Sequence, residues 1–471
     1  MKKHLSRFHT KKVAMIAGAA SLAALVPQVQ AQSAGDALIN KLEQKGILSA
    51  DEAKELRVES QQDYSNSFTN SFDKSFAAKV GTPDWVTGYK LTGDVRARID
   101  DTTVSSPYLA DRWRERYRLR VGLAVNMKDD LAAGFRLITG DYPSTSNQGG
   151  SPLSGNTTMQ DNGSKKSLYV DAAYGKWSPH GDNWTVSTIV GKMDQPFQVT
   201  PMEFDADYTP EGLALQSTYK LSDSQALAFN SGAFVLDNET PGTGLVAGTP
   251  FTSRDPFVYG FQLILNSKWS PKVESSVGVS IFDIASKENL GGANVQFINQ
   301  GNTRNSSTNL VNNYNPIVGS GSITYKLDSF PLYNGQFPVK LAGEFMDNPG
   351  ASKNNEGYWG GVTLGKSGKK GTWDVSYRYQ YLEADAWYDQ LVDDDNSAFY
   401  VASPGAGQKS GVMGGTNVKG HLVKFNYSIT DSLVFSTTCY VNSLINVPTH
   451  SPTVNPESDE IHFMADLMWK F

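Results

Sequence analysis

From Val86 onward the chain repeats one pattern, in which a strand-like segment is followed by a connection that is alternately short and long. About sixteen segments show the period-2 alternation of apolar and polar residues that predicts β-strands. Short connections such as 127–130 and 430–431 alternate with long polar ones such as 141–165 and 385–417. This regularity favours an all-β fold, a closed antiparallel barrel with turns at one end and long loops at the other. The predicted strands are 86–100, 113–126, 131–140, 166–177, 184–194, 211–220, 225–236, 257–269, 273–285, 317–327, 337–347, 356–366, 372–384, 418–429, 432–444 and 460–471.

The last predicted strand has one apolar face and ends on an aromatic residue. Ile461, Phe463, Ala465, Leu467, Trp469 and Phe471 share that face. A soluble domain usually ends in an exposed, frayed tail, whereas the final strand of a barrel pairs with the first strand. We therefore expect Phe471 and Trp469 to act as an assembly signal on a closing strand, and this ending resembles that of outer-membrane barrels. An ordinary edge strand is the alternative interpretation.

Residues 1–31 have the three parts of a secretory signal peptide. A basic start precedes an apolar run over 13–26, and Val29-Gln30-Ala31 provides a small-residue cleavage site. The apolar run is too short to span a bilayer well, and no later stretch approaches the roughly 20 apolar residues that a transmembrane helix needs. If the chain crosses a membrane, it therefore does so with strands.

Three segments follow the predicted signal peptide. Residues 32–57 show helical spacing of apolar residues, and Ser49 with Glu52 forms a capping box, so we expect a short periplasmic helical segment. Residues 58–85 are rich in Ser, Gln and Asn and are interpreted as a linker. Residues 86–471 form the predicted transmembrane barrel.

Composition and motifs argue against several classes of protein. The net charge is −6, and removal of the signal peptide would leave roughly −11, which is unfavourable for binding nucleic acid. The single cysteine, Cys439, precludes an internal disulfide. Histidines are scattered, and neither a metal-binding HExxH motif nor a GxSxG nucleophile motif is present. We expect no cofactor, no bound metal and no enzymatic activity.

Arginines occupy the polar face of the first three predicted strands. Apolar residues alternate with them, and a charge facing lipid near the bilayer midplane costs several kcal/mol, so a barrel must turn these arginines into its lumen. We expect them to line the pore and to shape ion passage. The alternative is the solvated face of a soluble sheet. The residues are Arg96, Arg98, Arg114, Arg116, Arg118, Arg120 and Arg136.

The signal peptide, the helical segment, the sixteen or so strands and the terminal Phe471 together resemble bacterial outer-membrane porins, in particular the group known as "putative porin". The resemblance covers nearly the whole mature chain. It implies an outer-membrane porin that passes small hydrophilic solutes and ions by diffusion. It also implies a homotrimer in contact with outer-membrane lipid and lipopolysaccharide, folded by the barrel-assembly machinery.

By resemblance to sixteen-stranded porins, the third long loop, 195–212, would fold inward and narrow the channel. Its acids Glu203, Asp205 and Asp207 would then face the arginines, and a transverse field would orient polar solutes. A solvated surface loop is the alternative. The acidic run 393–395 is interpreted as part of an ordinary extracellular loop, with cation bridging to lipopolysaccharide as a second reading.

Two other functions remain open from the sequence. One is a substrate-selective outer-membrane channel, for example for oligosaccharides or organic anions. The other is a secreted all-β protein that binds carbohydrate or has a structural role.

Overall fold

The computed structural model describes residues 83–105, 111–141, 150–238, 254–290, 299–305, 309–402, 411–446 and 458–471. The chain divides into two compact units, Met1–Tyr89 and Lys90–Phe471, and the barrel described below belongs to the second. The predicted signal peptide, the helical segment and most of the linker lie outside the described residues. Within the described part of the chain, no helix has the length and apolar character needed to cross a bilayer.

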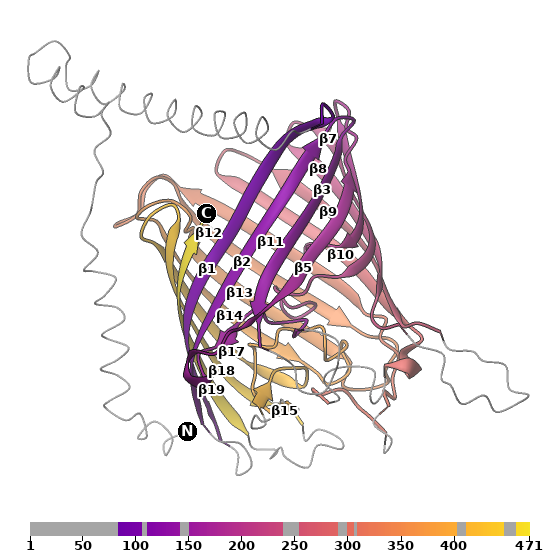
Figure 1. Ribbon diagram of the computed structural model, residues 1–471, viewed down its shortest axis with the longest axis vertical. Helices are drawn as coiled ribbons and strands as arrows, with labels where there is room; N and C mark the ends of the chain where they lie inside the picture. Colours follow the sequence, from indigo (N-terminus) through magenta and orange to yellow (C-terminus); the bar gives the residue numbers. More distant parts are fainter. Residues whose placement is uncertain are drawn as a thin grey trace, which may run out of the picture. The chain divides into compact units, whose positions relative to one another are not determined.

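The described chain is built almost entirely of strands, and every predicted strand overlaps an observed one (Figure 1). The long strands are β1 (Val86–Val104), β2 (Arg112–Met127), β3 (Leu131–Gly140), β5 (Ser167–Trp177), β6 (Trp184–Lys192), β7 (Glu211–Ser222), β8 (Gln225–Val235), β9 (Phe257–Lys268), β10 (Val273–Ala285), β11 (Ile317–Leu327), β12 (Phe337–Asp347), β13 (Glu356–Gly365), β14 (Trp373–Leu382), β17 (Val418–Ser428), β18 (Leu433–Leu444) and β19 (Asp459–Lys470). The short elements are β4 (Thr157–Thr158), β15 (Tyr400–Ala402), β16 (Gly411–Met413) and the 3₁₀ turns η2 (Asp161–Gly163) and η3 (Lys287–Asn289).

The sixteen long strands form one closed antiparallel sheet. Each pairs with its neighbours along the chain, and β1 pairs with both β2 and β19. At the closure Asp94 lies opposite Lys470, and Gly93 and Phe471 exchange two backbone hydrogen bonds of 2.8 and 3.0 Å. The prediction that the last strand pairs with the first is confirmed. Closure leaves no long strand of the sheet with an unpaired edge.

The two faces of the sheet differ in chemistry, as the alternation predicts. Large apolar side chains are exposed on the outer face, among them Leu213, Val277, Phe261, Leu263, Ile281 and Leu341. Tyr377, from the tyrosine stripe of β14, is 41% exposed and lies on this face beside Val423 of β17. Such a surface is stable against lipid and would be costly against water. The inner face carries polar and buried residues instead.

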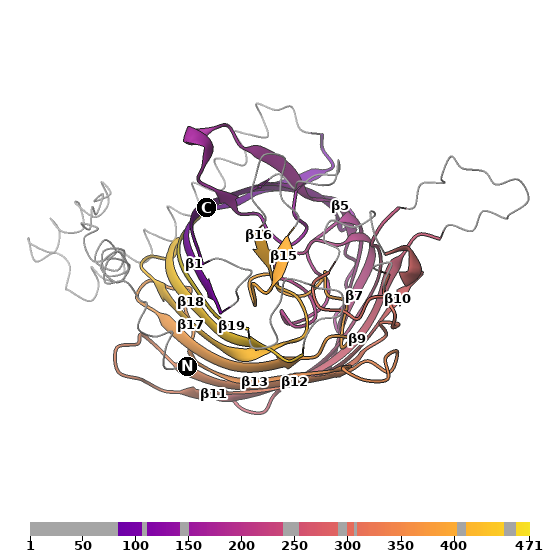
Figure 2. The ribbon, with the colours of Figure 1, turned by 90° about the horizontal axis from the view of Figure 1, so that it is seen from below.

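Short turns join the strands at one end of the barrel, for example at 128–130, 223–224 and 269–272, and we call this the turn end. The opposite end, where the long connections lie, is the loop end. Two of these connections matter for the interior: residues 193–210, the first inward loop, and residues 383–399, the second inward loop. Figure 2 shows the β15–β16 hairpin, which follows the second of them, inside the ring of strands.

The two inward loops pack against the inner wall through an apolar cluster. Phe204 of the first loop and Trp387 of the second lie 5.8 Å apart between ring centroids, and both contact Phe282 of β10 at 5.2 and 5.6 Å. Trp387 is fully buried. Wall residues of β6 to β14, including Phe234, join the same cluster. The barrel therefore has a hydrophobic core inside its lumen, on the side away from β1 to β3.

This packing corrects one interpretation made from the sequence. The acidic run 393–395 was expected in an ordinary extracellular loop, but it belongs to the second inward loop. The run follows Leu391 and Val392, which are buried in the apolar cluster. Burial of these neighbours draws the acids inward, a tertiary effect that the local sequence does not reveal.

Candidate functional site

The seven arginines predicted from the sequence lie on the inner face of three adjacent strands, where Arg112 at the start of β2 joins them, and we call these seven the arginine wall. Because successive side chains on a strand point to opposite faces, the even-numbered positions of β1 and β2 all face inward. Arg98, Arg116 and Arg118 are buried. The wall comprises Arg96 and Arg98 of β1, Arg114, Arg116, Arg118 and Arg120 of β2, and Arg136 of β3.

Two aspartates of β1 neutralise much of the charge on β2. Asp94 accepts hydrogen bonds from Arg118 at 3.0 Å and from Arg120 at 2.6 Å. Asp100 does the same for Arg114 at 2.6 Å and Arg116 at 3.4 Å. Carboxylates shared between guanidinium groups reduce the repulsion that stacked like charges would otherwise produce. Both aspartates stand on the same polar face as the arginines, so their position follows from the sequence pattern.

Barrel closure supplies a further counter-charge. Arg98 Nε donates to Asp466 of β19 at 2.7 Å, and Arg98 Nη1 donates to Asp395 of the second inward loop at 2.9 Å. His462, also on β19, lies 3.1 Å from Asp100 through Nε2 and 2.9 Å from the carbonyl oxygen of Asp395 through Nδ1. The first strand, the last strand and the second loop therefore meet at one polar network.

The first inward loop reaches the arginine wall through one of its three predicted acids. Asp207 lies 3.0 Å from Arg118 and 3.9 Å from Arg120. Glu203 instead lies near β12, where Thr200 donates its backbone N–H to Glu203 and its hydroxyl to Glu344, both at 2.9 Å. The expectation that all three acids face arginines is therefore wrong for Glu203, which the apolar cluster holds on the opposite side, and also for Asp205.

Asp205 contacts the other loop and not the wall. Its carboxylate accepts hydrogen bonds from the backbone N–H groups of Asp207 at 2.6 Å and Asp394 at 3.2 Å. Its own N–H donates to the carbonyl of Leu391 at 2.7 Å. Asp205 thus joins the two inward loops to each other.

The remaining wall arginines bind residues from other connections. Arg96 Nη2 donates to the Asn156 side chain at 2.6 Å. Arg136 pairs with Asp171 of β5 and, at 2.6 Å, with Asp194 at the start of the first inward loop. Sequence reasoning did not identify Asn156, Asp171, Asp194 or Asp466 as site residues, and it interpreted Asp395 as part of an extracellular loop. The signal available for Asp466 was its inward position on a strand predicted to pair with β1.

Carboxylates of the two inward loops form a tight acidic cluster. One ligand oxygen each from Asp205, Asp393 and Asp394 lies within 4.8 Å of the others. Burial, and then the neighbouring carboxylates, raise the pKa of Asp205 and Asp394 well above the usual range and that of Asp393 to about 6. Burial acts in the same direction on Asp395, but Arg98 outweighs it and lowers that pKa. Within the described residues, this is the group whose oxygen ligands would suit a hard cation such as Ca²⁺.

A closed sixteen-stranded barrel with an apolar outer face and a polar inner wall is a transmembrane barrel of the bacterial outer membrane. Residues 107–317, a range that includes β2 to β10 and the first residue of β11, match the family described as "Putative porin". Fold and family match together are those of an outer-membrane porin, and the resemblance seen in the sequence is confirmed. Family and fold are those of a channel.

Comparison with solved structures gives distant similarities. OprB of Pseudomonas putida, solved at high pH, is 10% identical with a TM-score of 0.47, covering 82% of this chain and 94% of that one. A double mutant of Rhodopseudomonas blastica porin is 11% identical with a TM-score of 0.39, covering 81% of this chain and 100% of that one. No curated protein sequence matches the chain.

Proposed function

We propose that this porin passes small hydrophilic solutes and ions by passive diffusion between the arginine wall and the two inward loops. The observation that carries the proposal is the ion pair between Arg118 of the wall and Asp207 of the first inward loop, at 3.0 Å. The apolar cluster fills the lumen on the side of β6 to β14. A hydrated solute is therefore confined to the polar boundary on the other side.

The charges along this boundary are arranged to select polar solutes. Guanidinium groups stand on the wall and carboxylates on the loops, in an interior of low dielectric where their fields are weakly screened. A field across the path orients dipolar solutes. An apolar solute gains no electrostatic stabilisation from this field to offset the cost of desolvation. The seven wall arginines and Asp207 remain our proposed pore residues, whereas Glu203 and Asp205 hold the first inward loop in place.

The test is solute flux through purified protein. Liposomes that contain the protein are expected to swell in small sugars at rates that fall steeply with sugar size. In planar bilayers the current is expected to rise linearly with salt concentration. Absence of both swelling and current from correctly folded, heat-modifiable protein would overturn the proposal.

A substrate-selective channel is the second candidate, and the buried ion pairs that tie both loops to the wall favour it, because they leave less free space than a loosely held loop. Such a channel would show a current or flux that saturates with one class of solute. We further propose a homotrimer without enzymatic activity, and a periplasmic location for residues 32–57. The mass of the detergent-solubilised protein tests the first of these.

A further inference from the structure

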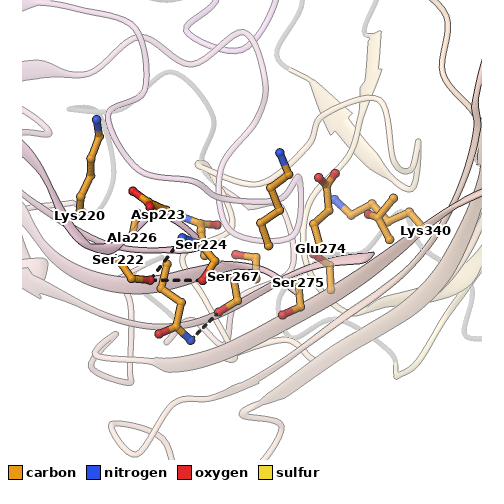
Figure 3. A pocket seen from close by; sticks show the side chains of 15 residues that line it. Lys220, Ser222, Asp223, Ser224, Ala226, Ser267, Glu274, Ser275 and Lys340 are labelled. Carbon is orange, nitrogen blue, oxygen red and sulfur yellow. Dashed lines mark hydrogen bonds between the residues drawn. The ribbon is translucent and has the colours of Figure 1, made fainter. Parts of the chain in front are cut away.

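The turn end of the inner wall contains a polar hollow distinct from the arginine wall. It has a volume of about 530 Å³ and is lined by the ends of β7 to β10 together with residues of β11 and β12 (Figure 3). Hydroxyl groups of Ser276, Ser322 and Thr324 belong to its lining. The hollow lies on the strands opposite to those that carry the arginines.

Three lysines from three strands converge on this hollow: Lys220 of β7, Lys268 of β9 and Lys340 of β12. Strand alternation places Lys220 on the same face as fully buried Ala214, and Lys340 on the same face as fully buried Met346. Figure 3 shows Lys220 and Lys340 on the same side of the sheet as Glu274.

Lys268 faces inward by the same alternation as Gln262, whose side-chain amide donates to the carbonyl of Gln198 in the first inward loop at 2.9 Å. The side chains of Lys220, Lys268 and Lys340 are all exposed, and inside a barrel this means exposure to the water of the lumen. The ammonium groups therefore remain hydrated.

The three lysines lack the counter-charges that the arginine wall has. No ion pair joins any of them to a carboxylate in the part of the chain that the structure describes. Glu274 lies opposite Lys268 in the strand register, but its carboxylate pairs with Lys326 at 2.7 Å. Asp223, in the adjoining turn, is the other acid of the lining. The lining thus has three lysines and two carboxylates, one of which is already paired with Lys326, and the hollow is net positive.

This imbalance distinguishes the hollow from the arginine wall, where aspartates pair with most of the guanidinium groups. Fixed charges that are already paired add little to the net potential along a pore, whereas unpaired charges attract ions of opposite sign. Ammonium groups are strongly hydrated point charges that bind oxyanions without the rigid bidentate geometry of arginine. Neighbouring hydroxyls can donate further hydrogen bonds to such an anion.

We propose that the hollow between β7 and β12 is a binding site for small multivalent oxyanions, with Lys220, Lys268 and Lys340 as the residues that recognise them. This deepens the proposed function and rests on it, since it assigns anionic solutes bearing carboxylate or phosphate groups as the class that the channel favours. Weak, hydrated contacts suit transport, because a solute must leave the site as well as enter it.

Inorganic phosphate is the probe, and chloride current through single channels is the readout. Phosphate is expected to reduce the chloride current of the unmodified protein in a saturable manner. In the variant with Lys220→Gln, Lys268→Gln and Lys340→Gln the half-blocking concentration is expected to rise about tenfold or more, equivalent to about 1.4 kcal/mol. The variant should also shift the reversal potential in a potassium chloride gradient toward cations.

A matched control removes the same number of positive charges outside the lumen. Lys128, Lys366 and Lys370 are exposed residues of the connections at the same end of the barrel. Their replacement by Gln is expected to leave both phosphate block and reversal potential unchanged. An equal effect in both variants would overturn the proposal, since a general surface charge would then explain it.

Binding is also measured without conduction. Phosphate is expected to raise the unfolding temperature of the detergent-solubilised barrel more than chloride does at equal ionic strength, because a ligand of the folded state stabilises it. The increase should be lost in the lumenal variant and kept in the control. Conducting channels without phosphate binding would overturn this inference alone, whereas phosphate binding to a barrel without conductance would overturn only the proposed diffusion.

Discussion

Arg118 of β2 and Asp207 of the first inward loop form an ion pair of 3.0 Å although 89 positions separate them in the chain. The same guanidinium donates to Asp94 of β1, also at 3.0 Å. Arg118 is only 3% exposed. One buried cation therefore compensates a wall carboxylate and a loop carboxylate at once, and its removal leaves Arg120 as the remaining cation beside both.

Ion preference is expected to change when the centre of the arginine wall is neutralised. Replacing Arg116 and Arg118 together by Gln should shift the reversal potential toward cations, because Asp94, Asp100 and Asp207 lose positive partners. The barrel should stay folded, since lumenal positions tolerate substitution better than lipid-facing ones. Lys369→Gln, at an exposed turn position, is the control. A folded double variant with an unchanged reversal potential would place these arginines away from the conducting path.

The single substitution Asp207→Asn should shift the reversal potential in the opposite direction. It removes a loop carboxylate but leaves Arg118 paired with Asp94, so the wall gains net positive charge and the loop loses a tether. We expect a shift toward anions and a higher single-channel conductance. Glu203→Gln, on the far side of the same loop, is the comparison and should leave the reversal potential unchanged. Equal effects of the two substitutions would contradict a specific role for Asp207.

Anchoring of the inward loops depends on the apolar cluster, and Trp387→Ala tests this. Loss of a fully buried tryptophan is expected to weaken loop packing by about 3–5 kcal/mol. The predicted outcome is noisier and larger channel current, with faster proteolysis of residues 383–399 in a barrel that remains heat-modifiable. Trp269→Ala, at an exposed position near the turn end, should not affect the current. Unaltered proteolysis and current in the Trp387 variant would show that the loops are held by their ion pairs.

Loop packing should also depend on pH through the acidic cluster. The folded-state pKa of Asp393 is raised to about 6, mainly by burial, above the unfolded value of roughly 4. The neutral form is therefore favoured in the folded state, and its stabilising contribution is present at acidic pH and lost as the pH rises through about 6. Asp395 shifts downward and stays ionised, so its pair with Arg98 persists over the same range.

The expected outcome is a quieter channel at pH 5 than at pH 7, measured as current noise at constant salt. Asp393→Asn should keep the channel quiet across this range, because the residue can no longer ionise. Asp237→Asn, an acid outside the cluster, provides the control. A pH dependence that survives in the Asp393 variant would assign the transition to another group.

Phe471 is expected to matter for assembly and not for conduction. It exchanges backbone hydrogen bonds with Gly93, and its ring occupies the space where a side chain at Gly93 would project, since a Cβ there would lie 2.4 Å from the ring. Deleting Phe471 should lower the amount of heat-modifiable barrel in the outer membrane. The substitution Phe471→Tyr, which keeps an aromatic ring at this position, should leave that amount normal. Channels that do form should have normal conductance. Normal levels of folded protein after the deletion would argue against an assembly signal.

Much of the barrel could be predicted because apolar and polar residues alternate along each strand. The inward position of Arg116 and Arg118 follows from their spacing on one strand and from the cost of placing charge against lipid. The same reasoning placed Tyr377 on the outer face. The inward course of residues 383–399 could not be predicted in this way, because its acids looked like those of any solvated loop.

The sequence by itself determined the strand number, the polar and apolar faces and the outer-membrane class, since these depend on period-2 patterning and on the chemistry of lipid. Tertiary structure decided which charges meet. Asp207 reaches Arg118 while Glu203 is held beside Glu344, because Phe204 between them is buried against Phe282 and Trp387. Asp466 meets Arg98 because the sheet closes. Contacts between segments hundreds of residues apart arise from packing and closure, which no local pattern encodes.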